Sequence, residues 1–208
     1  MNFELSADSR MLQEQARRFL RAESPLSTVR DLMEPGASVD TALWQRIADL
    51  GWLGAAIPER WGGIEMGQEA LCVLAEELGY ALTPVPAVAS TFIAAEALRE
   101  WGTRAQQDAL LPALAVGDRI GTVALFESAK ALDVQATWVE GRLTGTKICV
   151  PHGTSADFAV VVCRLQAGPD EVGLCLVDLQ TAGVERVAAA SLDASRPVAH
   201  LRFTDASA

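Results

Sequence analysis

The sequence predicts an α+β protein, in which an N-terminal all-α helical domain is followed by a small antiparallel β-barrel-like domain. Up to Asp118 the apolar residues recur at helical spacing, whereas from Ile120 onward they fall in short β-branched runs. Clusters of Gly, Asp and Pro separate these runs at short intervals with no helix between them, which favours an antiparallel barrel or sandwich. We therefore expect a helical domain at residues 1–118 and a β domain at residues 119–208.

The expected helices are apolar stripes bounded by capping and stop residues. Ser6 and Asp40 are suitable N-caps, because their side-chain oxygens can accept hydrogen bonds from the first turn of a helix. Gly51 and Gly79 are suitable stops, because glycine adopts the left-handed conformation that ends many helices. The helices are expected at residues 6–24, 40–50, 68–78, 87–101 and 104–116, with a further segment at 26–33.

The expected strands are runs rich in valine, isoleucine and other apolar residues in the second half of the chain. The runs on either side of Gly141 predict a hairpin, since glycine permits the positive φ of a tight turn. The strands are expected at residues 120–125, 134–139, 142–150, 158–165, 172–179 and 198–203.

Composition excludes several classes of protein. The formal net charge of -10 argues against a nucleic-acid partner, which needs clustered Lys and Arg. The four cysteines are scattered among apolar neighbours, so we expect buried, reduced thiols and a cytoplasmic protein. No apolar run approaches the ~20 residues of a membrane span, and the N-terminus has no export signal.

Most enzyme chemistries lack suitable residues in this sequence. With only two histidines, His152 and His200, there is little material for a metal cluster or a Ser–His–Asp arrangement, and we expect no metal. No glycine-rich phosphate loop is present. The acidic pair Glu76–Glu77 is interpreted as a solvated helix edge in preference to an acid–base pair.

A site built from residues 121–134 and 141–153 would lie at the junction of the two expected domains, where pockets tend to form. Several segments along the chain also share a common likeness. The segments are Leu43-Trp-Gln-Arg-Ile-Ala-Asp-Leu-Gly-Trp-Leu-Gly54, Ile57-Pro-Glu-Arg-Trp-Gly-Gly63, Ala75-Glu-Glu-Leu-Gly-Tyr-Ala-Leu-Thr-Pro84, Leu143-Thr-Gly-Thr-Lys147, Gly153 and Ala156-Asp157. In order and spacing the chain resembles the acyl-CoA dehydrogenase family over nearly its whole length.

The resemblance implies an FAD-dependent oxidoreductase that desaturates acyl-CoA thioesters at the α,β carbons, in the breakdown of fatty acids or steroid side chains. In that family a third, helical domain completes the flavin site, mediates oligomerisation and supplies the catalytic glutamate. Since the sequence ends at Ala208, we expect a fragment or an incomplete subunit without a catalytic residue of its own. The implied partners are acyl-CoA, a related subunit in a homo- or hetero-oligomer, and an electron-transfer protein.

The resemblance also places the cofactor, and several family contacts are changed there. The family's flavin-binding hydroxyl positions fall on Phe126, Leu132 and Pro151, so three polar contacts to FAD are lost. The alternative is therefore a catalytically silent, structural subunit that pairs with an active relative and binds flavin weakly or not at all. The cofactor-binding positions implied are Leu125, Phe126, Glu127, Ser128, Leu132, Cys149, Val150 and Pro151, of which Leu132 would also contact substrate.

Overall fold

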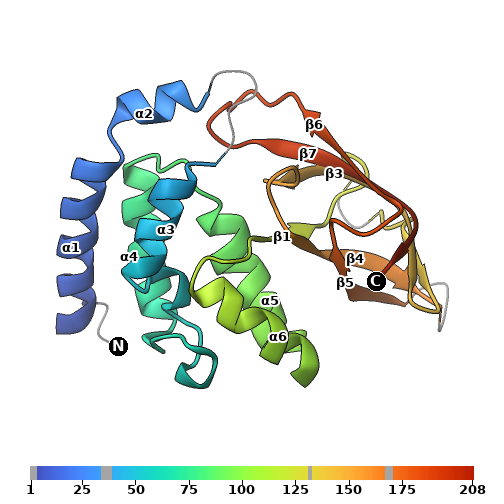
Figure 1. Cartoon of the computed structure of the whole chain (residues 1–208), viewed down its shortest axis with the longest axis horizontal. Helices are drawn as coiled ribbons and strands as arrows, with labels where there is room; N and C mark the ends of the chain where they lie inside the picture. Colours follow the sequence, from blue (N-terminus) through green and yellow to red (C-terminus); the bar gives the residue numbers. More distant parts are fainter. Residues whose placement is uncertain (1–3, 34–38, 131–132, 167–170) are drawn as a thin grey trace. The chain divides into compact units, whose positions relative to one another are not determined.

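The structure, a computed structural model, describes residues 4–33, 39–130, 133–166 and 171–208. The α+β class is confirmed, because helices make up the first part of the chain and strands the second (Figure 1). The chain divides into two compact units, Met1–Asp118 and Arg119–Ala208. Within the described residues no helix is long and apolar enough to cross a membrane.

Two helices of the helical unit begin at the N-cap residues that the sequence predicts. The Ser6 Oγ accepts a hydrogen bond from the Ser9 amide at 3.1 Å, and the Asp40 carboxylate accepts one from the Leu43 amide at 2.9 Å. The helices are α1 (Ala7–Glu23), α2 (Leu26–Asp31), α3 (Thr41–Asp49), α4 (Gly67–Tyr80), α5 (Ala95–Trp101) and α6 (Arg104–Ala115), with 3-10 turns η1 (Trp52–Gly54) and η2 (Glu59–Trp61) and a π-helical segment η3 (Val88–Ala94).

Two helix predictions are wrong in detail. Gly79 does not end α4, which continues to Tyr80, and the left-handed residue that follows is Leu82, with φ of 51°. The helix expected at residues 87–101 begins instead as the π-helical η3 and becomes α-helical only at Ala95. A π-helix is rare, and helical periodicity in the sequence does not distinguish it from an α-helix.

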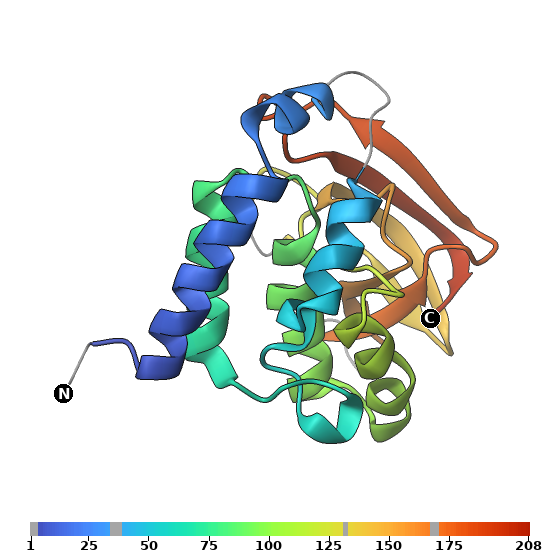
Figure 2. The same cartoon turned by 60° about the vertical axis from the view of Figure 1, so that its left-hand side comes forward.

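Helix α1 lies alongside α4, and the views in Figures 1 and 2 agree on this. The contact contains an ion pair with a buried carboxylate: Glu77 is 1% exposed and accepts hydrogen bonds from two nitrogens of the exposed Arg17, at 2.6 and 3.0 Å. The interpretation of Glu76–Glu77 as a solvated edge is therefore wrong for Glu77, although Glu76 is exposed. The reason is that α1 covers this side of α4, which the sequence of α4 alone does not reveal.

The second unit is a seven-stranded mixed sheet. One strand, β6, falls where the sequence predicts none. The strands are β1 (Gly121–Ala124), β2 (Thr137–Val139), β3 (Arg142–Pro151), β4 (Phe158–Leu165), β5 (Val172–Asp178), β6 (Val184–Ala189) and β7 (Val198–Ser207).

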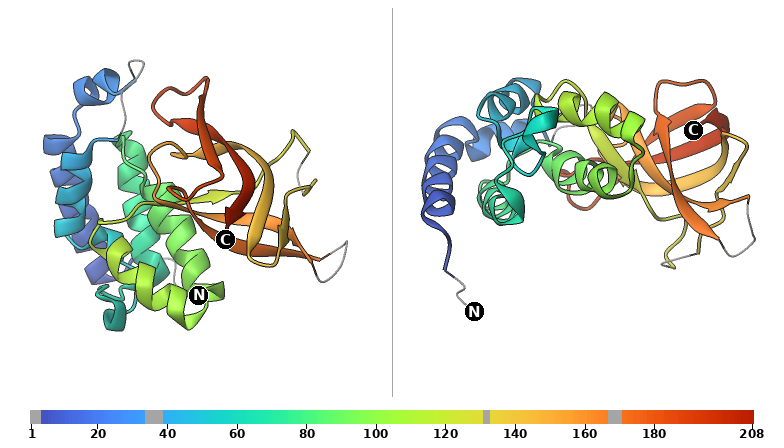
Figure 3. Two further views of the ribbon diagram at one scale, coloured as in Figure 1. Left: turned by 45° about the vertical axis from the view of Figure 1, so that its right-hand side comes forward. Right: turned by 90° about the horizontal axis from the view of Figure 1, so that it is seen from below.

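The strand order is β1-β4-β2-β3-β7-β6, with β5 paired to the other side of β4. The predicted hairpin of β2 and β3 around Gly141 is confirmed, and β7 lies between β3 and β6 (Figure 3). However, β1 and β2 both pair with β4 in parallel. Among the described strands the sheet is therefore mixed and open, and not a wholly antiparallel barrel. Alternating burial indicates which face of a strand is covered, but not the direction of its neighbour.

The prediction of buried cysteines is half right. Cys163 and Cys175 are buried in the core of the sheet, whereas Cys72 and Cys149 are exposed, and all four are free thiols. Cys149 is exposed because it occupies a β-bulge, with φ of 52°, where the pairing of β3 with β7 shifts register between Lys147 and Val150.

His152 makes the stability of the second unit sensitive to acid. It is 5% exposed and its Nδ1 is buried without a hydrogen-bond partner. Burial, and secondarily the charge of Arg196, lowers its pKa from 6.5 to about 4. Because the pKa of His152 is lower in the folded than in the unfolded protein, its contribution to the free energy of unfolding is fully present above pH 6.5. That contribution is lost as the pH falls towards 4.

We expect His152→Asn to lessen this acid sensitivity by up to about 3 kcal/mol between pH 7 and pH 4. Asparagine tolerates the positive φ of 51° found at this position. Urea unfolding of both proteins across this pH range measures the difference. Parallel stability–pH curves for the two proteins would contradict the assignment.

Candidate functional site

Two of the sequence-predicted site segments lie side by side in the sheet unit. Leu125–Ser128 follows β1, and Cys149–Pro151 ends β3. The Phe126 carbonyl oxygen accepts a hydrogen bond from the Ile148 amide at 2.8 Å, and the Thr122 hydroxyl donates one to the Pro151 carbonyl oxygen at 2.6 Å. These two bonds hold the segments together. Leu132, the remaining predicted position, lies outside the described residues.

The side chains of these segments do not all face the same way. Leu125 and Phe126 are 44% and 47% exposed, and Cys149 and Pro151 are exposed as well. Val150, at 1%, is buried in the core of the sheet. The bulge at Cys149 produces this arrangement, since it shifts the alternation of β3 between Lys147 and Val150.

A buried ion pair anchors the segment after β1. Lys147 is fully buried, and its Nζ lies 2.5 Å from the Glu127 Oε1 and 3.2 Å from the Leu125 carbonyl oxygen. The Glu127 carboxylate also accepts hydrogen bonds from the amides of Gln135 at 2.8 Å and Ala136 at 3.0 Å. Glu127 therefore links the segment after β1 to the residues just before β2 and to Lys147 in β3.

Lys147 was not among the sequence-predicted site residues, although a signal for it exists. Leu143 and Lys147 share one face of β3, because they are separated by an even number of residues, and Leu143 is a core residue. A lysine on the buried face of a strand requires an anionic partner. Glu127 is that partner.

The exposed side chains of the two segments offer few polar groups that could bind a flavin ring. An isoalloxazine carries carbonyl oxygens and ring nitrogens that need hydrogen-bond partners once buried. Leu125, Phe126 and Pro151 present apolar side chains there, and Cys149 presents a thiol. The Ser128 hydroxyl accepts a hydrogen bond from the Lys130 amide at 3.1 Å, within its own turn. The described side chains therefore do not fit the polar edge of FAD.

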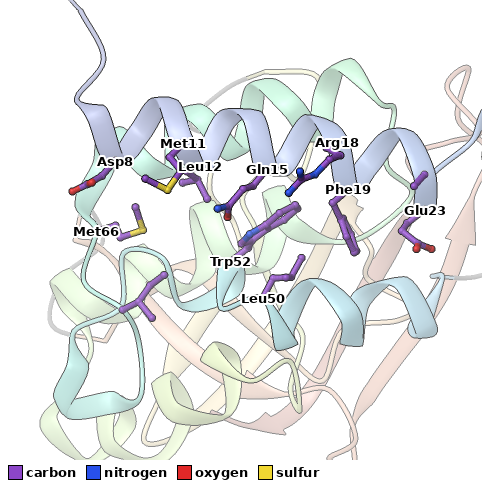
Figure 4. Close-up of a pocket in the computed structure, with 12 residues that line it drawn as sticks. Asp8, Met11, Leu12, Gln15, Arg18, Phe19, Glu23, Leu50, Trp52 and Met66 are labelled. Carbon is purple, nitrogen blue, oxygen red and sulfur yellow. The ribbon is translucent and has the colours of Figure 1, made fainter.

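The helical unit has a separate groove of about 540 Å³, shown in Figure 4. Its apolar walls come mainly from α1, with Met11 and Phe19, and from the segment around η1, with Leu50 and Trp52. The rings of Phe19 and Trp52 meet edge to face, with centroids 5.3 Å apart. None of the sequence-predicted site residues lines this groove.

Comparison with known proteins gives the family. A family model described as acyl-CoA dehydrogenase, N-terminal domain, matches residues 6–118, more than half of the chain. The acyl-CoA dehydrogenase FadE27 of Mycobacterium tuberculosis is 32% identical over 183 residues, which cover 81% of this chain and 49% of FadE27. The chain thus spans about half the length of this relative, and it spans 43% of the acryloyl-CoA reductase (NADH) of Anaerotignum propionicum.

Solved structures agree with this match. The ChsE4-ChsE5 complex from Mycobacterium tuberculosis superposes with a TM-score of 0.89 at 29% identity, over 100% of this chain and 57% of the matched chain. A Tcur3481-Tcur3483 steroid ACAD variant superposes with a TM-score of 0.86 at 33% identity, over 96% of this chain and 55% of the matched chain. The chain belongs to the acyl-CoA dehydrogenase family.

Proposed function

We propose that this chain is one subunit of an acyl-CoA dehydrogenase. The chain itself binds FAD weakly or not at all and acts together with a related polypeptide. The observation that carries the proposal is that Leu125, Phe126, Cys149 and Pro151 are all exposed and carry no hydroxyl group. By the family resemblance these residues correspond to flavin-contacting positions, and they lack the hydroxyl groups that the family has there. Each missing hydrogen bond to a buried polar group costs about 1–3 kcal/mol, so three of them weaken binding by orders of magnitude.

Two of the described carboxylates, Glu127 and Glu77, are also unsuited to proton abstraction. A general base must reach the substrate α-carbon and must be free to accept its proton. Glu127 is held by Lys147 and by two backbone amides. In the helical unit, Glu77 is buried against Arg17. We therefore assign no catalytic residue to the described part of the chain.

The relatives support a partnership of two polypeptides. Two matched structures are named for pairs, ChsE4-ChsE5 and Tcur3481-Tcur3483, and the second is called a steroid ACAD. By this likeness we propose a heteromeric assembly acting on an acyl-CoA thioester, with steroid side-chain and fatty acyl groups as the two substrate candidates. The electron-transfer protein expected from the family would act on the flavin of the partner.

The alternative is a flavoenzyme component in its own right. The observation that favours it is the pair of hydrogen bonds that holds the two segments together, from Ile148 to Phe126 and from Thr122 to Pro151. A flavin could then be bound by main-chain amides even without the side-chain hydroxyls. This alternative requires that FAD remain on the purified protein in full stoichiometry.

Flavin content and activity decide between the two functions. We expect the chain to purify colourless, with less than about one FAD per ten chains, given the lost hydrogen bonds. We also expect no dye reduction with short, long or ring-bearing acyl-CoAs, even with added FAD. The absorbance spectrum of the flavin and a dye-reduction assay measure both. Stoichiometric FAD, or turnover by the chain alone, would contradict the proposal.

A further inference from the structure

The sheet has two outer strands with very different edges. Among the described strands, β5 pairs only with β4, and β6 pairs only with β7. Each therefore has one edge whose backbone N–H and C=O groups meet no other strand in this part of the chain. Such an edge is a template for pairing with another chain, unless charges or bends protect it.

The edge strand β6 carries charged residues near its middle, whereas the one charged residue of β5 is its last, Asp178. Glu185 and Arg186 are adjacent near the middle of β6. In β5 the run from Val172 to Val177 contains no charged residue and no proline. Val172 and Leu174 are nevertheless 49% and 43% exposed. An edge whose central run is uncharged, β-prone and exposed favours strand pairing between molecules.

We propose that β5 pairs with β5 of a second copy of this chain, antiparallel and about a two-fold axis at Cys175. Cys175 is the middle residue of β5, so this register pairs the strand along its whole length. It also places each Leu174 opposite Leu176 of the other copy, each Gly173 opposite Val177, and each Val172 opposite Asp178 at the two ends of the paired region. A two-fold interface must be self-complementary in this way.

The faces of the two sheets also match in this register. Val172, Leu174 and Leu176 alternate with the inward-facing Cys175 and Val177, which belong to the core of the sheet. With the two-fold axis midway between the two Cys175 residues, each outward-facing side chain of one copy lies opposite an outward-facing side chain of the other. The four leucines then form one apolar cluster, and apolar cross-strand pairs stabilise a sheet. The dimer extends the sheet across both copies.

The first test is the oligomeric state of the full 208-residue chain, measured by sedimentation velocity over a range of concentrations. We expect a dimer, and we expect Leu174→Lys to weaken it at least about tenfold, because two ammonium groups would enter the leucine cluster. Val187→Lys is the matched control: Val187 is 49% exposed on β6, and its substitution should leave the dimer intact. A monomeric chain, or a dimer indifferent to Leu174→Lys, overturns the proposal.

A second test reads the register and does not depend on the folding of Leu174→Lys. With Cys72→Ser and Cys149→Ser, the remaining thiols are Cys163 and Cys175. Opposed strand residues have Cα atoms about 4.5–5.5 Å apart, within disulfide range. Copper phenanthroline with oxygen should therefore remove two electrons and two protons from the two Cys175 thiols and link the copies. Peptide mapping that finds no link, or a link through Cys163, overturns this register.

Discussion

Replacing Lys147 with methionine should destabilise the sheet unit by about 3–5 kcal/mol. Lys147 is fully buried, and the carboxylate of Glu127 that it neutralises is only 9% exposed. Removing the lysine leaves that carboxylate charged in a site closed to water, and breaking a buried pair from one side carries a penalty of this size. Urea unfolding followed by far-UV circular dichroism measures the loss.

Two further variants separate the buried charge from simple loss of side-chain volume. In Lys147→Met combined with Glu127→Gln no unpaired charge remains, so much of the stability should return. The exposed pair of Arg119 and Asp178, at 3.0 Å, provides the matched control, and Arg119→Ala should cost less than about 1 kcal/mol. If the double variant is no more stable than Lys147→Met, the unpaired charge is not the cause.

The second large effect concerns flavin binding. Phe126→Thr together with Pro151→Thr should raise the affinity for FAD by about 10- to 100-fold, because it restores two hydroxyls and one backbone N–H at the proposed flavin face. Both positions are exposed, so the substitutions bury no new polar group in the protein alone. Fluorescence titration with FAD measures the dissociation constant.

Val139→Thr serves as the control for this experiment. Val139 is an exposed apolar residue on β2, 43% exposed and outside the predicted site, and its substitution should leave the FAD affinity unchanged. An equal response from Val139→Thr would show that the gain is not specific to the site. Unchanged affinity in the Phe126/Pro151 variant would show that these positions do not face the flavin.

Most of the helices and strands could be predicted from the sequence, because the position of each one follows from its own local residue pattern. Ser6 and Asp40 cap helices, and the strand expected at residues 158–165 is β4 with the same bounds. The missed strand is β6, whose charged and alanine residues do not give the alternation of a half-buried strand. The parallel pairing of β1 and β2 with β4 was also missed, because strand direction is a property of the tertiary fold.

The site shows the same division between local and tertiary information. The sequence indicated that Phe126 and Pro151 lack hydroxyls, since this depends only on residue type. It did not indicate the ion pair of Glu127 with Lys147, which joins the segment after β1 to the middle of β3. Nor did it indicate that Val150 turns inward, because the bulge at Cys149 reverses the expected alternation at that point.

The pairing of β3 with β7 affects the order in which the protein acquires structure during synthesis. Among the described strands, β7 follows β6 in the chain and lies between β3 and β6, with Arg142 opposite Ser207 and Val187 opposite His200. When synthesis has reached only the end of β6, the strands β3 and β6 are therefore present, but β7, which pairs with both of them, is not. The helical unit forms its contacts from residues that are synthesised earlier, whereas the sheet can be completed only after β7 has been synthesised. During that interval the apolar run from Val172 to Val177 of β5 is available to other nascent chains, and a chaperone that binds extended apolar segments could bind it.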